Sequence, residues 1–305
     1  MDIGIVGLGR MGGNMARRLS RGGARVVGFD PDPAVRSSLA EEGVIEPAES
    51  SLALVQALRA PRIVWLMVPA GNVTECAIEA LLPTMTRGDA LVDGGNANYK
   101  DSERRAASLA NAGIHFVDCG VSGGVWGLAN GYALMFGGSL EAARLVEPYA
   151  RILAPGPDQG WLHCGPAGSG HFVKMIHNGI EYGMMQAMAE GFALLEGKKP
   201  YALDLAAVAE TWRHGSVVRS WLLDLTAEFL AEDATLGSIA PLVADSGEGR
   251  WTVNEAVEQG VSAPVMALAL MSRFDSQGRA DFSHKLLAMM RRGFGGHAVQ
   301  RGGVE

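Results

Sequence analysis

A glycine-rich turn near the start of the chain constrains the fold more than any other feature. The residues Gly7-Leu8-Gly9-Arg10-Met11-Gly12 follow the apolar run Asp2 to Val6 and lead into a helical pattern that begins at Asn14. Glycines at this spacing between a strand and a helix are typical of dinucleotide-binding βαβ units, where the helix N-terminus faces the pyrophosphate. In a chain with 41 glycines the pattern alone is weak, and a structural turn without a nucleotide is the alternative. Its position between a strand and a helix favours a dinucleotide site.

Short apolar runs alternate with helical patterns through the first half of the chain. This alternation predicts a doubly wound parallel sheet of the Rossmann type, with strands at 3–6, 25–29, 63–67, 90–92, 115–117 and 132–136. A Pro- and Gly-rich segment, 154–160, ends the alternation, and long helical segments follow between 170 and 292. We therefore predict an α/β Rossmann-type domain over residues 1–160 and an all-α domain for substrate binding and oligomerisation over residues 161–305.

Net charge and composition exclude several classes of function. The chain of 305 residues has a net charge of −7, which argues against nucleic-acid binding because that function needs a basic face. No window approaches about 18 consecutive apolar residues, and no basic segment followed by an apolar core opens the chain, so we expect neither a membrane span nor export. The three cysteines show no metal-ligand or disulfide spacing. We expect a cytoplasmic protein without a metal.

An acidic residue at the end of the second predicted strand indicates which dinucleotide binds. Asp30 lies about 20 residues beyond the glycine-rich turn, where a carboxylate accepts the ribose hydroxyls of NAD and repels the 2′-phosphate of NADP. No lysine or arginine follows immediately, since the next residues are Pro31, Asp32 and Pro33. We predict NAD as the preferred cofactor, while Arg36 keeps NADP open as the alternative.

Five polar side chains share one face of an otherwise apolar helical segment. At about 100° per residue, Lys174, His177, Asn178, Glu181 and Tyr182 fall within an arc of about 140°. Polar groups are costly to bury without partners, so a buried polar face indicates a function. The alternative to a buried functional face is a solvated face with a surface pair between Lys174 and Glu181. Burial favours the neutral forms of lysine and glutamic acid. Lys174 would then act as a base and Glu181 as a proton donor, beside Asn178, in a nicotinamide-dependent dehydrogenase.

Several motifs in register point to one enzyme family. They are GLGRMGGNMARRL from Gly7, VDGGN from Val92, FVDCGVSGGVWGLANG from Phe116, GSGHFVKMIHNGIEYGMMQ from Gly168, DSGEGRWT from Asp245 and FGGH from Phe294. Over nearly its whole length the chain resembles the 6-phosphogluconate dehydrogenases, specifically their short form. The resemblance implies oxidative decarboxylation of 6-phosphogluconate to ribulose 5-phosphate and CO2, with reduction of NAD or NADP and without a metal.

The resemblance also implies roles for individual residues. A lysine at the position of Lys174 takes the proton of the substrate 3-hydroxyl, and a glutamate at the position of Glu181 protonates carbon 1 after CO2 has left. Cofactor contacts are implied for Val68, Pro69, Ala70 and Asn96. Substrate contacts are implied for Asn96, Ser122, Gly123, Gly124, His177, Asn178, Tyr182, Arg273, Arg291 and His297. The last two come from a neighbouring subunit in the family, so a homodimer or homotetramer with shared active sites is implied.

One segment departs from the long form of the family. Where the long form carries a lysine and a threonine for the phosphate, this chain has Ser246 and Glu248. Phosphate binding therefore rests on Tyr182, Arg273 and Arg291. Three alternatives stay open at this point: a dehydrogenase of an unphosphorylated sugar acid, a non-decarboxylating 3-hydroxyacid dehydrogenase on the same fold, and a catalytically silent NAD-binding protein.

Overall fold

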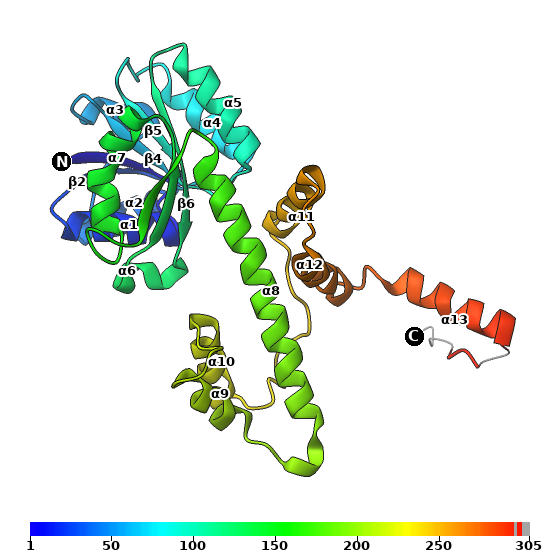
Figure 1. The fold of residues 1–305 in the computed structure, drawn as a ribbon. Coiled ribbons are helices and arrows are strands. Elements are labelled where there is room, and N and C mark those ends of the chain that lie inside the picture. The colour runs from blue at the N-terminus through cyan, green and yellow to red at the C-terminus, as the bar shows by residue number, and fades with distance from the viewer. Residues whose placement is uncertain (296–297, 301–305) are drawn as a thin grey trace. The chain divides into compact units, whose positions relative to one another are not determined.

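The contacts within the chain divide it into two compact units. The computed structural model describes residues 1–295 and 298–300. The first unit comprises Met1–Ile176 and the second His177–Glu305. Figure 1 shows a sheet covered by helices in the first unit and helices in the second. The predicted combination of a Rossmann-type α/β part and an all-α part is confirmed.

One eight-stranded sheet organises the first unit. Its strands lie in the order β3-β2-β1-β4-β5-β6-β7-β8. All neighbouring strands run parallel except β6 and β7, which run antiparallel. Because β1, β4, β5 and β6 are parallel neighbours, the loops after them share one edge of the sheet. The strands are β1 (Asp2–Val6), β2 (Arg25–Phe29), β3 (Glu46–Pro47), β4 (Ile63–Leu66), β5 (Ala90–Asp93), β6 (His115–Ser122), β7 (Ala133–Gly137) and β8 (Trp161–Gly165).

Helices cover both faces of this sheet, so its central strands are buried on both sides. In β4, Ile63 and Trp65 belong to one apolar cluster, which also includes residues of α1 and α7. Val64 and Leu66 belong to a second cluster, with residues of α3, α4 and α5. This double burial explains why the sequence shows continuous apolar runs. The helices are α1 (Arg10–Arg21), α2 (Pro33–Glu41), α3 (Ser51–Ala57), α4 (Asn72–Leu81), α5 (Tyr99–Ala110), α6 (Gly127–Asn130) and α7 (Leu140–Leu153), with a 3-10 turn at Gly124–Trp126.

The structure differs from the sequence-based expectation at β8. Residues 161–165 were predicted to begin the helical part, yet they form a strand parallel to β7. The Trp161 ring stacks on Phe136 of β7 at 6.1 Å between centroids, and the His163 ring lies 5.8 Å from the same phenyl ring. The strand is short and only half-buried. It therefore lacks the continuous apolar run that marks the central strands.

The regular secondary structure in the described part of the second unit is helical, as predicted. The helix α8 (Ser169–Gly197) begins in the first unit and continues into the second. Two helix pairs follow, α9 (Leu205–Arg213) with α10 (Trp221–Glu232), and α11 (Glu248–Gln259) with α12 (Pro264–Ser276). Each pair shares a small apolar cluster with residues of α8. A short 3-10 turn, Lys199–Tyr201, precedes α9, and α13 (Asp281–Gly295) is the last helix. Among the helices of residues 1–295, none combines the length and hydropathy needed to cross a membrane.

Candidate active site

The glycine-rich turn has the shape that a dinucleotide needs. Gly7 has a φ of +90°, and a Cβ on it would lie 2.5 Å from the carbonyl oxygen of Met67. A Cβ on Gly12 would overlap the Gly7 carbonyl oxygen, whereas a Cβ on Gly9 would meet no atom within 4 Å. The backbone at Gly9 therefore faces open space at the start of α1, where no side chain caps the helix. Uncapped amides and an open approach together fit a pyrophosphate.

The end of β2 places a carboxylate beside this turn. One oxygen of Asp30, Oδ2, accepts a hydrogen bond from the Leu8 amide at 2.7 Å, and Oδ1 accepts one from the Asp32 amide at 3.0 Å. Arg36 donates from Nη1 to the Asp30 carbonyl at 2.7 Å and from Nη2 to Glu49 at 3.0 Å. The basic residue that kept NADP open is thus engaged within the chain.

The loops after β4 and β5 touch each other and the glycine-rich turn. A Cβ on Gly7 would lie 3.0 Å from the Val68 side chain, and one on Gly95 would lie 2.7 Å from the Val68 carbonyl oxygen. Pro69 accepts a hydrogen bond from the Thr74 hydroxyl at 2.9 Å, which ties this loop to α4. Val68, Pro69, Ala70 and Asn96, predicted to contact the cofactor, therefore lie on loops at one edge of the sheet.

The end of β6 forms a tight turn at the predicted carboxylate-binding segment. Ser122 is the last residue of the strand, and Gly123 and Gly124 have φ values of +125° and +51°. Residues other than glycine rarely adopt such backbone conformations. These two residues lead into the 3-10 turn Gly124–Trp126, which carries the exposed side chains of Val125 and Trp126.

The polar face of α8 is divided into a buried and a half-exposed part. Lys174 and Asn178 are buried, with exposed fractions of 8% and 7%, and Tyr182 is buried as well. The side chains of His177 and Glu181 are each 41% exposed, and their Nδ1 and Oε2 atoms lie 3.8 Å apart. The expectation that the whole face is buried is therefore wrong for these two residues.

The structure brings together two of the residues predicted to bind the phosphate. The Arg273 guanidinium lies over the Tyr182 ring, with Cζ 3.4 Å from the centroid. The Tyr182 hydroxyl lies 3.3 Å from the Ser246 hydroxyl, and Arg273 also donates to the Ala244 carbonyl at 2.8 Å. Arg291 lies exposed on α13. His297 lies outside the described residues.

Comparison with known proteins defines the family. Residues 2–156 match the NAD binding domain of 6-phosphogluconate dehydrogenase, and residues 170–298 match the C-terminal domain of 6-phosphogluconate dehydrogenase. The chain belongs to the 6-phosphogluconate dehydrogenase family.

Individual relatives agree with this assignment. The NAD(+)-dependent, decarboxylating 6-phosphogluconate dehydrogenase of Haloferax volcanii is 44% identical over 303 residues, which is 99% of each chain. The NADP(+)-dependent, decarboxylating enzyme of Bacillus subtilis is 37% identical over 90% of this chain, which spans 61% of that longer protein. A solved structure of the Plasmodium falciparum enzyme, studied with NADP+ and with 6-phosphogluconate, has a TM-score of 0.85 at 29% identity and covers 100% of this chain and 67% of its own. The family therefore includes both NAD- and NADP-dependent members.

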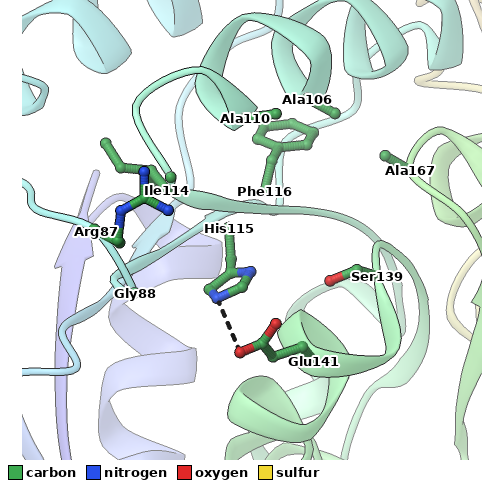
Figure 2. Close-up of a pocket in the computed structure, with 11 residues that line it drawn as sticks. Arg87, Gly88, Ala106, Ala110, Ile114, His115, Phe116, Ser139, Glu141 and Ala167 are labelled. Carbon is green, nitrogen blue, oxygen red and sulfur yellow. Dashed lines mark ion pairs between the residues drawn. The ribbon is translucent and has the colours of Figure 1, made fainter.

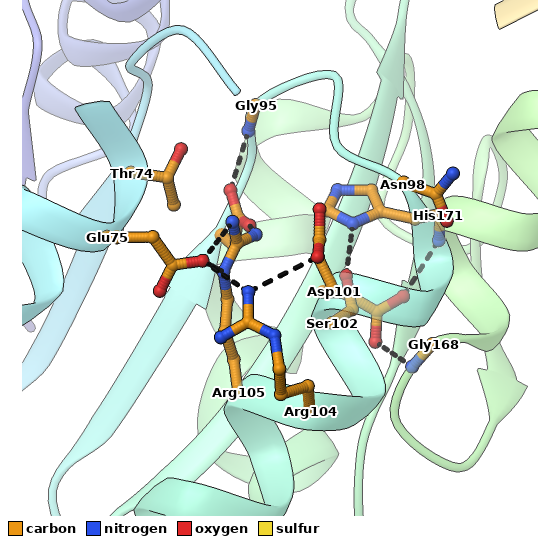
Figure 3. Close-up of polar contacts among 12 residues, drawn as sticks. Thr74, Glu75, Gly95, Asn98, Asp101, Ser102, Arg104, Arg105, Gly168 and His171 are labelled. Carbon is orange, nitrogen blue, oxygen red and sulfur yellow. Dashed lines mark hydrogen bonds and ion pairs between the residues drawn. The ribbon is translucent and has the colours of Figure 1, made fainter. Parts of the chain in front are cut away.

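A buried polar network beside the sheet edge was missed by sequence reasoning. Asp93 ends β5 and Asp118 lies in β6, and both carboxylates are fully buried. Burial raises the pKa of Asp93, while the nearby His171 and Arg105 act in the opposite direction. Figure 3 shows His171 and Arg105 approaching this region from α8 and α5. The available signal was a carboxylate at the end of a buried apolar strand, which is costly unless it has a partner.

A separate pocket lies away from the loops that the family uses. It has a volume of about 460 Å³ and includes Gly88, which precedes β5, and His115, which begins β6. Figure 2 shows His115 pointing toward Glu141, and Nε2 and Oε1 of the two side chains lie 3.9 Å apart. The amino ends of β5 and β6 are opposite to the edge that carries the glycine-rich turn. This pocket is therefore not part of the candidate active site. Among the described residues, no cluster of side chains has the composition of a metal site.

Proposed function

We propose that this chain oxidises and decarboxylates 6-phosphogluconate to ribulose 5-phosphate and CO2, with NAD as the electron acceptor. One observation carries the proposal beyond family membership. The buried Lys174 and the half-exposed Glu181 stand two turns apart on one helix, so a single element supplies a base and an acid. A reaction that removes a proton at one stage and returns one at a later stage needs such a pair.

The chemistry follows from where protons must move. Lys174 accepts the proton of the substrate 3-hydroxyl, and bound NAD supplies the acceptor for the hydride that leaves carbon 3. The resulting ketone lies β to the carboxylate, so the bond between carbons 1 and 2 of the substrate breaks and its electrons form an enediol as CO2 departs. Glu181 then donates a proton to the terminal carbon of the enediol. Asn178, buried one turn beyond Lys174, orients the substrate hydroxyls.

The phosphate is assigned to the cluster around Tyr182. Arg273 brings a positive charge to this ring, and the hydroxyls of Tyr182 and Ser246 lie at hydrogen-bond distance from each other. One nitrogen of the Arg273 guanidinium donates to the Ala244 carbonyl. A guanidinium has five N–H donors, so the others can still bind a phosphate. This arrangement supports a phosphorylated substrate over a free sugar acid.

NAD is the preferred cofactor in this proposal. Asp30 presents a carboxylate at the end of β2, and Arg36 is engaged by Glu49 and by the Asp30 carbonyl. A 2′-phosphate would meet a negative charge there and would have to compete for the arginine. The Haloferax volcanii relative, which is described as NAD(+)-dependent, is consistent with this preference.

A homo-oligomer with shared active sites accompanies the proposed function. Apolar side chains recur at helical spacing on α13 and are exposed, among them Phe282, Leu286 and Met289. Exposed apolar faces of this kind mark protein interfaces. A second copy that covers α8 would also provide the burial that Glu181 lacks in the single chain.

The three unpaired cysteines are consistent with a reducing compartment, so we propose that the protein is cytoplasmic.

The function is tested by steady-state kinetics with product identification. Phosphorylated and free aldonic acids are compared with NAD and NADP, and CO2 and pentulose are measured. We expect turnover of 6-phosphogluconate with stoichiometric CO2, and loss of turnover by several orders of magnitude in Lys174→Ala while NAD still binds. Oxidation without CO2 would identify a non-decarboxylating dehydrogenase, and equal use of gluconate would contradict the phosphate assignment. NAD binding without turnover of any acid would indicate a silent binding protein.

A further inference from the structure

The start of α8 is held by a carboxylate from a distant strand. Asp118 of β6 accepts the Gly168 amide at Oδ1 and the His171 amide at Oδ2, both at 2.7 Å. The first amides of a helix have no partners within the helix, and a negative charge there is favourable. Asp118 therefore acts as an N-cap supplied from 50 residues away. Its complete burial makes these two hydrogen bonds stronger and their loss more costly.

The same strand also fixes the position of Lys174. A Cβ on Gly170 would lie 2.5 Å from the Asp118 carbonyl oxygen, so α8 packs directly on the backbone of β6. A Cβ on Gly120 would overlap the Cβ of Lys174. Asp118 and Gly120 are alternate residues of β6 and face the same side of the strand. Two residues of β6 thus fix the position of Lys174: Asp118 by its hydrogen bonds to the start of α8, and Gly120 by its close packing against Lys174.

A second connection runs from α8 through α5 to the loop that carries Asn96. The Ser102 hydroxyl lies 2.7 Å from His171 Nδ1, and both side chains are buried. One turn further along α5, Arg105 donates to Asp93 Oδ2 at 2.8 Å. The other oxygen of Asp93 accepts the Gly95 amide at 3.2 Å. Figure 3 shows this chain of contacts.

We propose that Asp118, Ser102 and His171 are positioning residues for the reaction, which set the place of Lys174 relative to the loop 93–96. The proposal rests on the proposed function, because it assumes that Lys174 is the base. Three sets of polar atoms in this network are matched: Asp118 with two amides, Ser102 with Nδ1 of His171, and Arg105 with Asp93. Misplacement of a reacting group by about 1 Å can cost about 100-fold in rate. The gain in rate from a fixed Lys174 can therefore offset the free-energy cost of burying these polar groups.

The working atom of His171 is Nδ1. Its Nε2 is buried and has no hydrogen-bond partner among the residues that the structure describes. An asparagine at this position can place a polar atom where Nδ1 lies, whereas a glutamine reaches the place of Nε2. Comparison of His171→Asn with His171→Gln therefore separates a role of the bond to Ser102 from a role of Nε2.

The matched control for Asp118 is Asp89. It is equally buried and accepts two backbone amides, from Arg62 at 2.7 Å and from Thr86 at 2.8 Å. It also pairs with the Arg62 guanidinium at 3.1 Å and accepts the Thr86 hydroxyl at 3.3 Å. It precedes β5 and therefore lies at the opposite edge of the sheet. The variants Asp118→Asn and Asp89→Asn make the same chemical change, and Asp89→Asn also weakens the ion pair with Arg62, so its loss of melting temperature should be at least as large. Only the first is expected to affect Lys174.

The experiment measures kcat, the Kd for NAD, melting temperature and amide hydrogen exchange of residues 168–174. We expect Asp118→Asn and His171→Gln to lower kcat at least tenfold with the Kd for NAD within twofold, and to speed exchange in this segment at least tenfold. His171→Asn is expected to stay within about threefold of wild type, and Asp89→Asn within twofold. Ser102→Ala is the milder variant if Asp118→Asn does not fold, and we expect it to lower kcat at least fivefold.

Equal kcat losses in Asp118→Asn and Asp89→Asn would overturn the proposal, since they would reflect stability alone. Retention of kcat in His171→Gln together with its loss in His171→Asn would overturn the role of Nδ1. If the wild-type protein does not turn over 6-phosphogluconate, the proposed function fails, and the hydrogen-exchange arm decides the positioning role separately. Faster exchange at 168–174 in Asp118→Asn but not in Asp89→Asn would then still support the anchor of α8.

Discussion

The choice between NAD and NADP can be tested at Asp30. In the structure this carboxylate lies at the end of β2 and accepts the Leu8 amide of the glycine-rich turn at 2.7 Å. The proposed role is to accept the ribose hydroxyls of NAD. The substitution Asp30→Asn removes the charge with little change in size. It leaves one oxygen that can still accept the Leu8 amide, so the turn itself is retained.

The expected magnitude follows from the kind of hydrogen bond that is lost. Hydrogen bonds to charged groups contribute about 1.5–3 kcal/mol. Since about 1.4 kcal/mol corresponds to a factor of ten, kcat/KM for NAD should fall about 10- to 150-fold. With NADP, kcat/KM should rise, because the carboxylate that repels the 2′-phosphate is gone. The ratio of the two constants therefore shifts by more than either constant alone.

The assay is steady-state kinetics with both cofactors at a saturating concentration of 6-phosphogluconate. Asp32→Asn is the matched control, because it makes the same change two residues away. Asp32 caps α2 through the Ala34 amide at 2.9 Å, and asparagine caps a helix about as well as aspartate, so the control should leave stability nearly unchanged. It should change the cofactor ratio less than threefold. A wild-type preference for NADP, or an unchanged ratio in Asp30→Asn, would refute the reasoning.

Three further predictions concern other parts of the first unit. Glu49 is exposed and pairs with Arg36 at 3.0 Å, and exposed pairs contribute about 0.2–1 kcal/mol. Glu49→Gln should therefore raise kcat/KM for NADP by up to about fivefold and change kcat/KM for NAD less than twofold. A lower kcat/KM for NADP would contradict the view that Glu49 holds Arg36 away from the 2′-phosphate. Gly120→Ala should displace Lys174 and lower kcat at least tenfold. Its control is Gly191→Ala, where a Cβ meets no atom within 4 Å; this variant should leave kcat unchanged and add up to about 1 kcal/mol of stability. An unaltered kcat in Gly120→Ala would show that the contact with Lys174 adapts. In thiol titration of the folded protein, the exposed Cys76 should react first and the buried Cys119 only on unfolding, because burial raises the pKa of Cys119 and blocks access of the reagent. Burial also raises the pKa of Cys164, which should react at an intermediate rate. Early loss of the Cys119 thiol would contradict the packing of β6.

Local patterns were sufficient to predict most of the fold. The strands of the central sheet are buried on both faces, so each produced a continuous apolar run that the sequence displays directly. The glycine-rich turn could be assigned because its steric requirements are local: Gly7 needs a positive φ, and Gly12 contacts the turn itself. The long helices were recognised from their periodicity. By contrast, β8 depends on the Trp161 ring stacking against β7, which no local pattern reveals.

The candidate site was predicted in part, and its errors concern burial. Apolar neighbours on α8 indicated a buried helix, but they do not say which part of its circumference is covered. Lys174 is covered by β6, whereas His177 and Glu181 are half exposed in the single chain. In the proposed oligomer a second copy would cover these side chains, and the periodicity of one sequence does not contain that information. Arg273 and Tyr182 were both predicted to bind the phosphate, and they lie in contact, while their shared role stays a prediction.

His171 shows how far the polar face of α8 could have been followed. At about 100° per residue it lies about 60° from Lys174, inside the arc that the other polar residues occupy. The face therefore begins one turn earlier than the five residues that first defined it. What the arc could not reveal is the partner of each member, because Ser102 is 69 residues away and Asp118 is 53 residues away. The same helical face thus contains two kinds of residue: those proposed to act on the substrate, and one that connects the helix to the sheet and to α5. The kcat of His171→Asn relative to His171→Gln tests the connecting role, because only the asparagine can keep a polar atom at the place of Nδ1 beside Ser102.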